Sequence, residues 1–211
     1  MTNSDSTVSR PDAELVQRAA RFSTATLGEA LGKRGDLPPA IKPIALSMRV
    51  CGPAVTVSSP PLDNLALHKA IYLAAPGDVL VVEVSGYFEA GYWGEILTQA
   101  ALCRNIAGLV IDGCVRDSSA IEQTKFPVFS RGLCIRGTTK KGAGRINQPI
   151  TIGEIRISPG DLVVGDRDGV VVVPQSELAA VLAAAVAREQ KEDRVKQQLK
   201  SGRTTLEIYG W

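Results

Sequence analysis

Hydrophobic positions follow two different periods along the chain, and these periods separate helices from strands. Spacing of about 3.6 residues is typical of a helix with one buried face, while short continuous apolar runs are typical of buried strands. Apolar residues at helical spacing begin after Asp12. Further along, the pattern predicts strands over Val50–Val57, Val79–Val84, Leu109–Ile111 and Val128–Ser130, and helices over Asp63–Ala75, Glu95–Asn105 and Ser118–Gln123.

Strands that alternate with helices in this way are typical of an α/β protein with a mixed sheet. After Arg131 the pattern changes, and residues 150–157 and 170–173 predict β-hairpins. A helix is expected over residues 176–201; its first half is apolar and its second half is charged, so the second half should face solvent or a neighbouring subunit. Because a domain averages about 150 residues, the length predicts a single domain over residues 1–211, with residues 1–10 frayed.

Composition and charge exclude several classes of protein. Hydrophobic residues make up 45% and charged residues 22%, which is typical of a globular protein. The 24 basic and 22 acidic residues leave a net charge of +2, so no electrostatic argument favours nucleic acid or a membrane surface as a partner. No apolar run approaches the ~20 residues that span a bilayer, and the N-terminus does not resemble a secretory signal. The sequence therefore predicts a cytoplasmic protein.

The numbers of histidines and cysteines limit the kinds of catalytic and metal site that the chain can build. His68 is the only histidine, so one chain cannot build a histidine-rich metal site or a pair of histidine acid–base groups. Its place in an apolar-periodic stretch favours a packed or surface histidine on a helix. The four cysteines form no CxxC pair and are expected to be free thiols. No lysine lies within an apolar strand, where burial would lower its pKa, and this disfavours a Schiff-base enzyme.

Two glycine-containing stretches carry the candidate chemistry, Gly91–Leu97 and Gly108–Asp117. Each joins a strand to a helix, and ligands bind at the carboxyl ends of strands in α/β sheets. Free N–H groups of Gly94, Glu95, Ile96 and Leu97 at a helix N-terminus would bind an anion. Arg116 offers a planar fork for a carboxylate, and Asp117 offers an oxygen ligand for a divalent cation. Together they suit a 2-oxo acid, whose developing enolate needs a metal and a cation.

Each stretch also has an ordinary structural interpretation. Gly94–Glu95 is compatible with a simple helix start that has a favourable acidic charge, and Arg116–Asp117 with a surface ion pair and an N-cap. The basic loop over residues 136–145 either closes over an anionic substrate or forms a solvated hairpin. These alternatives require a structure to separate them.

The order and spacing of these residues resemble the RraA-like family, which contains 4-hydroxy-4-methyl-2-oxoglutarate aldolases and regulators of ribonuclease activity. The likeness runs from about Leu27 to Pro174 and centres on Gly94-Glu95-Ile96-Leu97 and on Arg116-Asp117, 22 residues after Gly94. It implies an α/β/β sandwich of the swivelling, phosphohistidine-domain-like type. It also implies a homotrimer or homohexamer with sites between subunits.

For the aldolases, the resemblance implies a role for each matching position. Backbone amides of Gly94 to Leu97 bind the pyruvyl carboxylate, Arg116 contacts substrate oxygen, Asp117 binds Mg²⁺ or Mn²⁺, and Glu95 orders water at the metal. The chain departs from the pattern at Ala120, where the aldolases have an acidic residue. A further acid would come from a neighbouring subunit's C-terminal region, and three candidates remain open: Glu189, Glu192 and Asp193.

Two functions follow from these expectations. The first is a metal-dependent aldolase that cleaves a 4-hydroxy-2-oxo dicarboxylic acid to pyruvate and a second oxo acid, with oxaloacetate decarboxylation as a side reaction. The alternative is a non-catalytic trimer that regulates a ribonuclease or another protein. Retention of Gly94, Glu95, Arg116 and Asp117 favours the enzyme.

Overall fold

The computed structural model describes residues 8–142 and 144–211. Residues 1–7 of the predicted frayed segment lie outside this part of the chain. Within it, the Arg10 guanidinium donates hydrogen bonds of 2.8 and 2.7 Å to the buried carboxylate of Asp78. The start of the described chain is therefore tied to the turn before a central strand.

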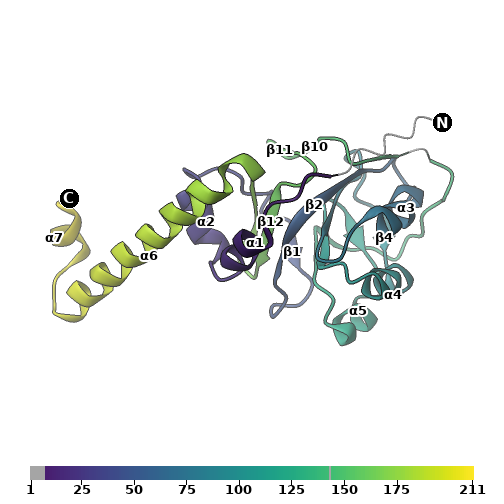
Figure 1. Cartoon of the computed structure of the whole chain (residues 1–211). Coiled ribbons are helices and arrows are strands. Elements are labelled where there is room, and N and C mark those ends of the chain that lie inside the picture. Colours follow the sequence, from purple (N-terminus) through teal and green to yellow (C-terminus); the bar gives the residue numbers. More distant parts are fainter. Residues whose placement is uncertain (1–7, 143) are drawn as a thin grey trace.

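A mixed sheet forms the centre of the molecule (Figure 1). Its four inner strands run parallel, as the alternation of helices and strands predicts, and the outer strands run antiparallel. In spatial order the strands are β1 (Lys42–Pro43), β7 (Val128–Ser130), β5 (Gly108–Ile111), β3 (Val79–Glu83), β2 (Val50–Ser58), β12 (Leu162–Asp166) and β13 (Gly169–Val173), with β9 (Arg145–Ile146) paired to β2. The α/β class expected from the sequence is confirmed.

The sheet curls until its two end strands approach each other, where Lys42 on β1 donates a hydrogen bond to the carbonyl of Asp168 before β13. Helices cover it from two sides in Figure 1. One group comprises α3 (Leu65–Leu73), α4 (Glu95–Cys103) and α5 (Ser118–Thr124), and the other α1 (Ala13–Ala19), α2 (Thr24–Ala30) and α6 (Leu178–Lys200). Separate clusters of buried side chains lie under each group, so the inner strands are apolar on both faces.

A second, smaller parallel sheet lies beside α3 and α4. Its strands are β4 (Gly91–Trp93), β6 (Cys114–Val115) and β8 (Gly132–Leu133), and a hairpin of β10 (Ile150–Ile152) and β11 (Ile155–Ile157) covers another part of the core. Strands of two or three residues are too short to show a period, and the sequence marked no separate sheet here. This small sheet positions the candidate site, because β4 leads into α4 and β6 leads into α5.

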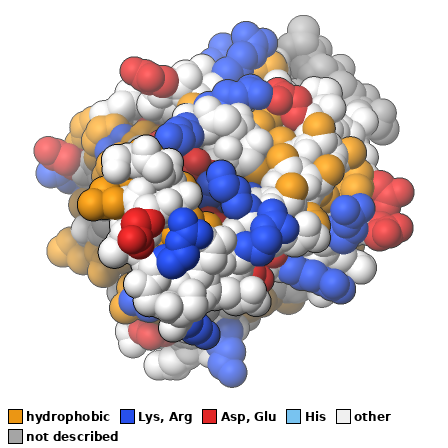
Figure 2. Space-filling model, turned by 90° about the vertical axis from the view of Figure 1, so that its left-hand side faces the viewer, with side chains coloured by type: hydrophobic (Ala, Val, Ile, Leu, Met, Phe, Trp, Pro, Cys, Tyr) orange, Lys and Arg blue, Asp and Glu red, His pale blue; other side chains and the backbone are white. Residues whose placement is uncertain are grey.

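The C-terminal helix α6 agrees with the predicted helix to within two residues at its N-terminal end, where a 3₁₀ turn (Gln175–Glu177) precedes it. Leu178, Val181, Leu182 and Ala185 pack against the body, while the charged half extends away from it and leads to α7 (Thr205–Tyr209) (Figure 1). Figure 2 looks onto this end of the molecule and shows Lys and Arg side chains between patches of hydrophobic ones. Among the described residues, no helix has the length and apolar character needed to cross a membrane.

Candidate active site

Two loops meet at the carboxyl ends of β4 and β6. The strands pair in parallel with Trp93 opposite Val115, so the residues that follow them lie side by side. The N–H of Arg116 donates a 2.8 Å hydrogen bond to the carbonyl of Trp93 and fixes this register. Gly94 therefore stands next to Arg116 and Asp117, although 22 residues separate Gly94 from Arg116 in the chain.

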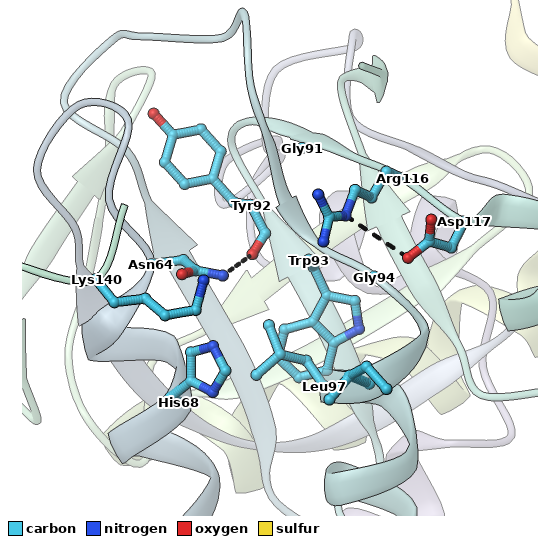
Figure 3. Close-up of a pocket in the computed structure, with 11 residues that line it drawn as sticks. Asn64, His68, Gly91, Tyr92, Trp93, Gly94, Leu97, Arg116, Asp117 and Lys140 are labelled. Atoms are coloured by element: carbon cyan, nitrogen blue, oxygen red, sulfur yellow. Dashed lines mark hydrogen bonds and ion pairs between the residues drawn. The ribbon is translucent and has the colours of Figure 1, made fainter. Parts of the chain in front are cut away.

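A pocket opens where these loops meet α3 (Figure 3). Arg116 and Asp117 lie on one side of it, with the first turn of α4 below them. The residues that line the pocket are Asn64, His68, Gly91, Tyr92, Trp93, Gly94, Ile96, Leu97, Arg116, Asp117 and Lys140. Five of the six predicted site residues thus share one pocket.

Asp117 joins the two loops. It occupies the N-cap position of α5 with a φ of +57°, a left-handed conformation that aspartate tolerates better than most residues. Its Oδ2 accepts a 3.1 Å hydrogen bond from the N–H of Glu95 and lies 3.6 Å from Nε of Arg116. The side chains of Arg116 and Asp117 are both nearly half exposed, so a ligand can reach them.

Gly94 is required by this close approach. A Cβ at Gly94 would lie 2.3 Å from Oδ2 of Asp117 and 3.2 Å from Cγ of Arg116. The absence of a side chain also leaves the first turn of α4 accessible. The first N–H groups of a helix have no acceptor within the helix. Among the described hydrogen bonds the N–H of Glu95 is used by Asp117, whereas those of Ile96 and Leu97 have no acceptor and can bind an anion.

Glu95 differs from the other predicted residues. Its side chain is exposed and is absent from the pocket lining, although Gly94 and Ile96 on either side of it contribute to that lining. The structure therefore brings the backbone N–H of Glu95 to the site, while its carboxylate is not part of the pocket lining. Glu122, the acid nearest to the position of Ala120, also lies outside the pocket.

The sequence pattern did not predict the residues on the opposite side of the pocket. Asn64 and His68 come from the start of α3, and Lys140 comes from the basic loop; Figure 3 shows the three side chains gathered across from Arg116. His68 lies on a helix, as expected, and is half-buried; the sequence did not predict that it also lines the pocket. Burial, and then the positive charge of Lys140, lower the pKa of His68, so the imidazole is mostly neutral at pH 7.

Asn64 has one satisfied and one unsatisfied polar atom. Its Nδ2 donates a 2.9 Å hydrogen bond to the carbonyl of Tyr92, which fixes the orientation of the side chain. Its Oδ1 is buried and accepts no hydrogen bond from the described residues. A buried acceptor without a donor costs about 1–3 kcal/mol. This amide oxygen is therefore a favourable position for a hydroxyl or N–H group of a ligand.

Two fully buried aromatic residues form the floor. Trp93 stacks on Phe126 with the ring centroids 6.1 Å apart, and its indole N–H donates a 2.7 Å hydrogen bond to Oγ1 of Thr98. The hydroxyl of Tyr92 donates to the carbonyl of Tyr87 at 2.9 Å, and burial raises its pKa. Both rings pack in the core and line the pocket, so the floor is rigid.

The residues present suit a water-rich metal site. Asp117 is the only carboxylate among the described lining residues, and the described chain contains no cluster of three or more His, Cys, Asp or Glu side chains that could hold a metal. Mg²⁺ commonly binds through one or two carboxylates and keeps several waters, so one aspartate fits such an ion. On α6, Glu192 pairs with Arg188 at 2.7 Å and Asp193 with Lys196 at 3.1 Å. This helix lies across the sheet from α3 and α4 (Figure 1), and its acids do not line this pocket.

Comparisons with known proteins show the family of the chain and its fold neighbours. The family model described as RraA-like, Aldolase/RraA, matches residues 24–172. A protein of Halalkalibacterium halodurans, provisionally named a 4-hydroxy-4-methyl-2-oxoglutarate aldolase, is 37% identical over 191 residues, which cover 90% of each chain. A solved structure from Pseudomonas syringae pv. tomato has a TM-score of 0.81 at 34% identity, covering 93% of this chain and 96% of that one. RraAS2 of Streptomyces coelicolor, described as an unusual member of the RNase ES inhibitor RraA family, has a TM-score of 0.79 at 32% identity, covering 89% and 98%.

Proposed function

The chain belongs to the RraA-like family, and on that premise we propose that it is a divalent-metal-dependent aldolase. Its substrate would be a 4-hydroxy-2-oxo dicarboxylic acid of the 4-hydroxy-4-methyl-2-oxoglutarate type, and its products pyruvate and a second oxo acid. The observation that carries this proposal is the meeting of Gly94, Arg116 and Asp117 in one pocket. A carboxylate, a carbonyl and a metal can be held together there.

The pyruvyl end of the substrate binds beside α4. The free N–H groups of Ile96 and Leu97 donate hydrogen bonds to its carboxylate, and the positive end of the helix dipole lies behind them. Arg116 adds a planar donor that can contact a carboxylate oxygen and the 2-oxo oxygen at once. Asp117 would hold Mg²⁺ or Mn²⁺, which would supply Lewis-acid polarisation of the 2-oxo group.

Cleavage breaks the C3–C4 bond. The C4 hydroxyl loses its proton and becomes the carbonyl of the second product, while the bonding pair stays on C3 as the enolate of pyruvate. Protonation of C3 then gives pyruvate and balances the proton lost from the hydroxyl. Arg116 stabilises the developing enolate oxygen by donating to it. Loss of CO₂ from oxaloacetate breaks the equivalent bond and leaves the same enolate, so we expect oxaloacetate decarboxylation as a side reaction.

Asn64, His68 and Lys140, across the pocket from Arg116, contact the C4 hydroxyl and the second carboxylate of the substrate. Oδ1 of Asn64 accepts a hydrogen bond from the C4 hydroxyl and gains the donor that it lacks in the protein. His68 is the lining side chain best suited to take up the hydroxyl proton, because its neutral imidazole has a free lone pair. Lys140 contributes a positive charge for the second carboxylate.

A homotrimer or homohexamer would complete the site. Its support is the placement of Glu189, Glu192 and Asp193 on a helix that extends away from the chain's own pocket (Figure 1). One of these acids would reach the metal region of a neighbouring subunit. Light scattering at micromolar concentration should give a trimer or hexamer, whereas a monomer would contradict shared sites.

The second candidate is a protein that regulates a ribonuclease. The similarity to RraAS2 supports it, since that relative is described as a member of an RNase inhibitor family. The two functions are separated by an assay coupled to pyruvate, with 4-hydroxy-4-methyl-2-oxoglutarate and oxaloacetate as substrates. We expect turnover of both with Mg²⁺ or Mn²⁺ and none in chelator. No pyruvate from either acid would favour the regulator, and metal-independent turnover would contradict the metal-dependent mechanism.

A further inference from the structure

One buried carboxylate fastens the basic loop to the pocket. Asp63 is 3% exposed and directly precedes Asn64. Its Oδ2 accepts a 2.7 Å hydrogen bond from Oγ1 of Thr139 and a 2.5 Å hydrogen bond from the N–H of Lys141. These two donors stand on either side of Lys140. The backbone that carries Lys140 is therefore fixed at both neighbouring residues by a single side chain 77 positions earlier in the sequence.

The two oxygens of Asp63 act on different elements. While Oδ2 binds the loop, Oδ1 accepts a 2.9 Å hydrogen bond from the N–H of Leu65, the first residue of α3. The carboxylate thus joins the helix that carries His68 to the loop that carries Lys140. A side chain with only one acceptor oxygen could serve the helix or the loop, but not both.

Further hydrogen bonds join the basic loop to the residues just before α3. The N–H of Thr139 donates to the carbonyl of Leu62 at 2.6 Å, and the N–H of Asn64 donates to the carbonyl of Thr139 at 3.0 Å. A Cβ at Gly142 would lie 3.0 Å from Cγ of Asp63, so the loop passes directly over the carboxylate. The described part of the basic loop is therefore anchored at residues 139–142 beside the pocket, while most of its side chains stay exposed to solvent.

We propose that Asp63 is a positioning residue that holds Lys140 over the pocket and thereby gives the site its preference for substrates with a second carboxylate. The inference rests on the proposed function, because it takes Arg116 and the start of α4 as the site of the first carboxylate. Burial raises the pKa of Asp63, but the hydrogen bonds from Lys141, Leu65 and Thr139 outweigh it and lower the pKa to about 2. The anchor is thus ionised throughout the neutral range.

Asp63→Asn separates positioning from a purely structural role. Asparagine keeps one acceptor oxygen, which can remain on Leu65 and preserve the start of α3. Its NH₂ group would then face the N–H of Lys141, donor against donor, and release the loop. Asp161→Asn is the matched control, because Asp161 is also buried and also accepts two backbone hydrogen bonds, from Ser158 and Gln175, but does not line the pocket.

The test compares the affinity for 2-oxoglutarate, which has two carboxylates, with that for pyruvate, which has one. Calorimetry in the presence of Mg²⁺ is applied to wild-type protein, Asp63→Asn, Lys140→Met and the double variant. We expect each single variant to lower the affinity for 2-oxoglutarate about tenfold, as loss of one charged contact would. The affinity for pyruvate should change by less than about twofold. The double variant should be no weaker than Lys140→Met alone. Lys141→Met and Asp161→Asn should leave the ratio of the two affinities unchanged.

Amide hydrogen exchange over residues 136–142 supplies the structural readout, and it should increase in Asp63→Asn. The proposal is overturned if Asp63→Asn lowers the affinities for both acids equally, or if its effect on the affinity for 2-oxoglutarate adds to that of Lys140→Met. Unchanged amide hydrogen exchange in the loop would also overturn it. Wild-type protein that binds neither acid contradicts the proposed function itself, and this inference falls with it. If the wild-type protein binds both acids and the variants keep the wild-type ratio of the two affinities, only the role of Asp63 is contradicted.

Discussion

The backbone N–H of Glu95 donates a 3.1 Å hydrogen bond to Oδ2 of Asp117, although 22 residues separate the two along the chain. This bond joins the first turn of α4 to the N-cap of α5. It places a potential metal ligand against the anion-binding end of a helix. The contact is possible only because the residue before Glu95 is glycine.

Gly94→Ala should therefore disrupt the site. The added Cβ would lie 2.3 Å from Oδ2 of Asp117, a distance that forces the carboxylate or the loop to move. We expect activity to fall by at least about 10²-fold, as a misplacement of about 1 Å can cost. Gly28→Ala is the control. It lies in α2 with nothing within 4 Å of the new Cβ, and it should retain activity and gain up to about 1 kcal/mol of stability, because alanine favours a helix. Equal activity of the two variants would contradict the assigned geometry.

Arg116→Lys should be nearly as damaging as Arg116→Ala. Lysine keeps the charge but loses the planar fork that can hold two oxygens. The expected loss is about 10²–10³ in kcat, equivalent to roughly 2.7–4 kcal/mol, as for the removal of an oxyanion donor. Steady-state kinetics on oxaloacetate measure it, and Arg104→Lys, at the exposed C-terminal end of α4, serves as control. If Arg116→Lys kept more than about a tenth of the wild-type kcat, a bulk charge would suffice there.

Asp117→Ala should act through metal affinity. Removal of the one carboxylate in the pocket lining should raise the Mg²⁺ concentration needed for half-maximal activity, so excess Mg²⁺ should restore part of the rate. Excess Mg²⁺ should not restore the activity of the Arg116 variants. Metal titrations of the three proteins distinguish these outcomes. An Asp117→Ala variant with an unchanged Mg²⁺ requirement would show that the metal binds elsewhere.

The anchor at Asp63 should make stability sensitive to acid. Its folded-state pKa is lowered from 3.8 to about 2, so the stabilising effect is complete above pH 3.8 and is lost as the pH falls toward 2. The difference in unfolding free energy between wild type and Asp63→Asn should therefore shrink by about 2 kcal/mol between pH 5 and pH 2. Urea titrations at a series of pH values measure it. Lys140→Met, which keeps both acceptor oxygens of Asp63 in use, should retain the wild-type pH dependence, and a difference independent of pH would contradict the lowered pKa.

The parallel core and one half of the site could be predicted from local sequence. Apolar runs such as Val79–Val84 are long enough to show that a strand is buried, and β3 ends within one residue of that prediction. Gly94, Arg116 and Asp117 could be grouped because each follows a strand and precedes a helix. The side chain of Glu95 could not be placed, because its absence from the pocket lining depends on its position on the helix and not on its residue type.

The other half of the site depends on contacts between distant segments. Lys140 reaches the pocket because Asp63 binds Thr139 and Lys141, and no periodicity links positions so far apart. His68 was expected to be a packed or surface histidine because its neighbours are apolar, yet a residue on such a helix can also face a pocket. The signal that could have found it is Asn64, since a polar residue four positions before His68 shares its face of the helix.

The central claim is that the pocket forms the enolate of pyruvate, and exchange of the C3 protons of pyruvate in D₂O tests it most directly. Proton NMR should show loss of the methyl signal with Mg²⁺ or Mn²⁺, no loss in chelator, and a rate at least about 10²-fold lower for Arg116→Ala. This measurement needs no second substrate and no coupled enzyme. Exchange that is absent from the wild-type protein with either metal, or that proceeds equally in chelator, would contradict a metal-dependent aldolase.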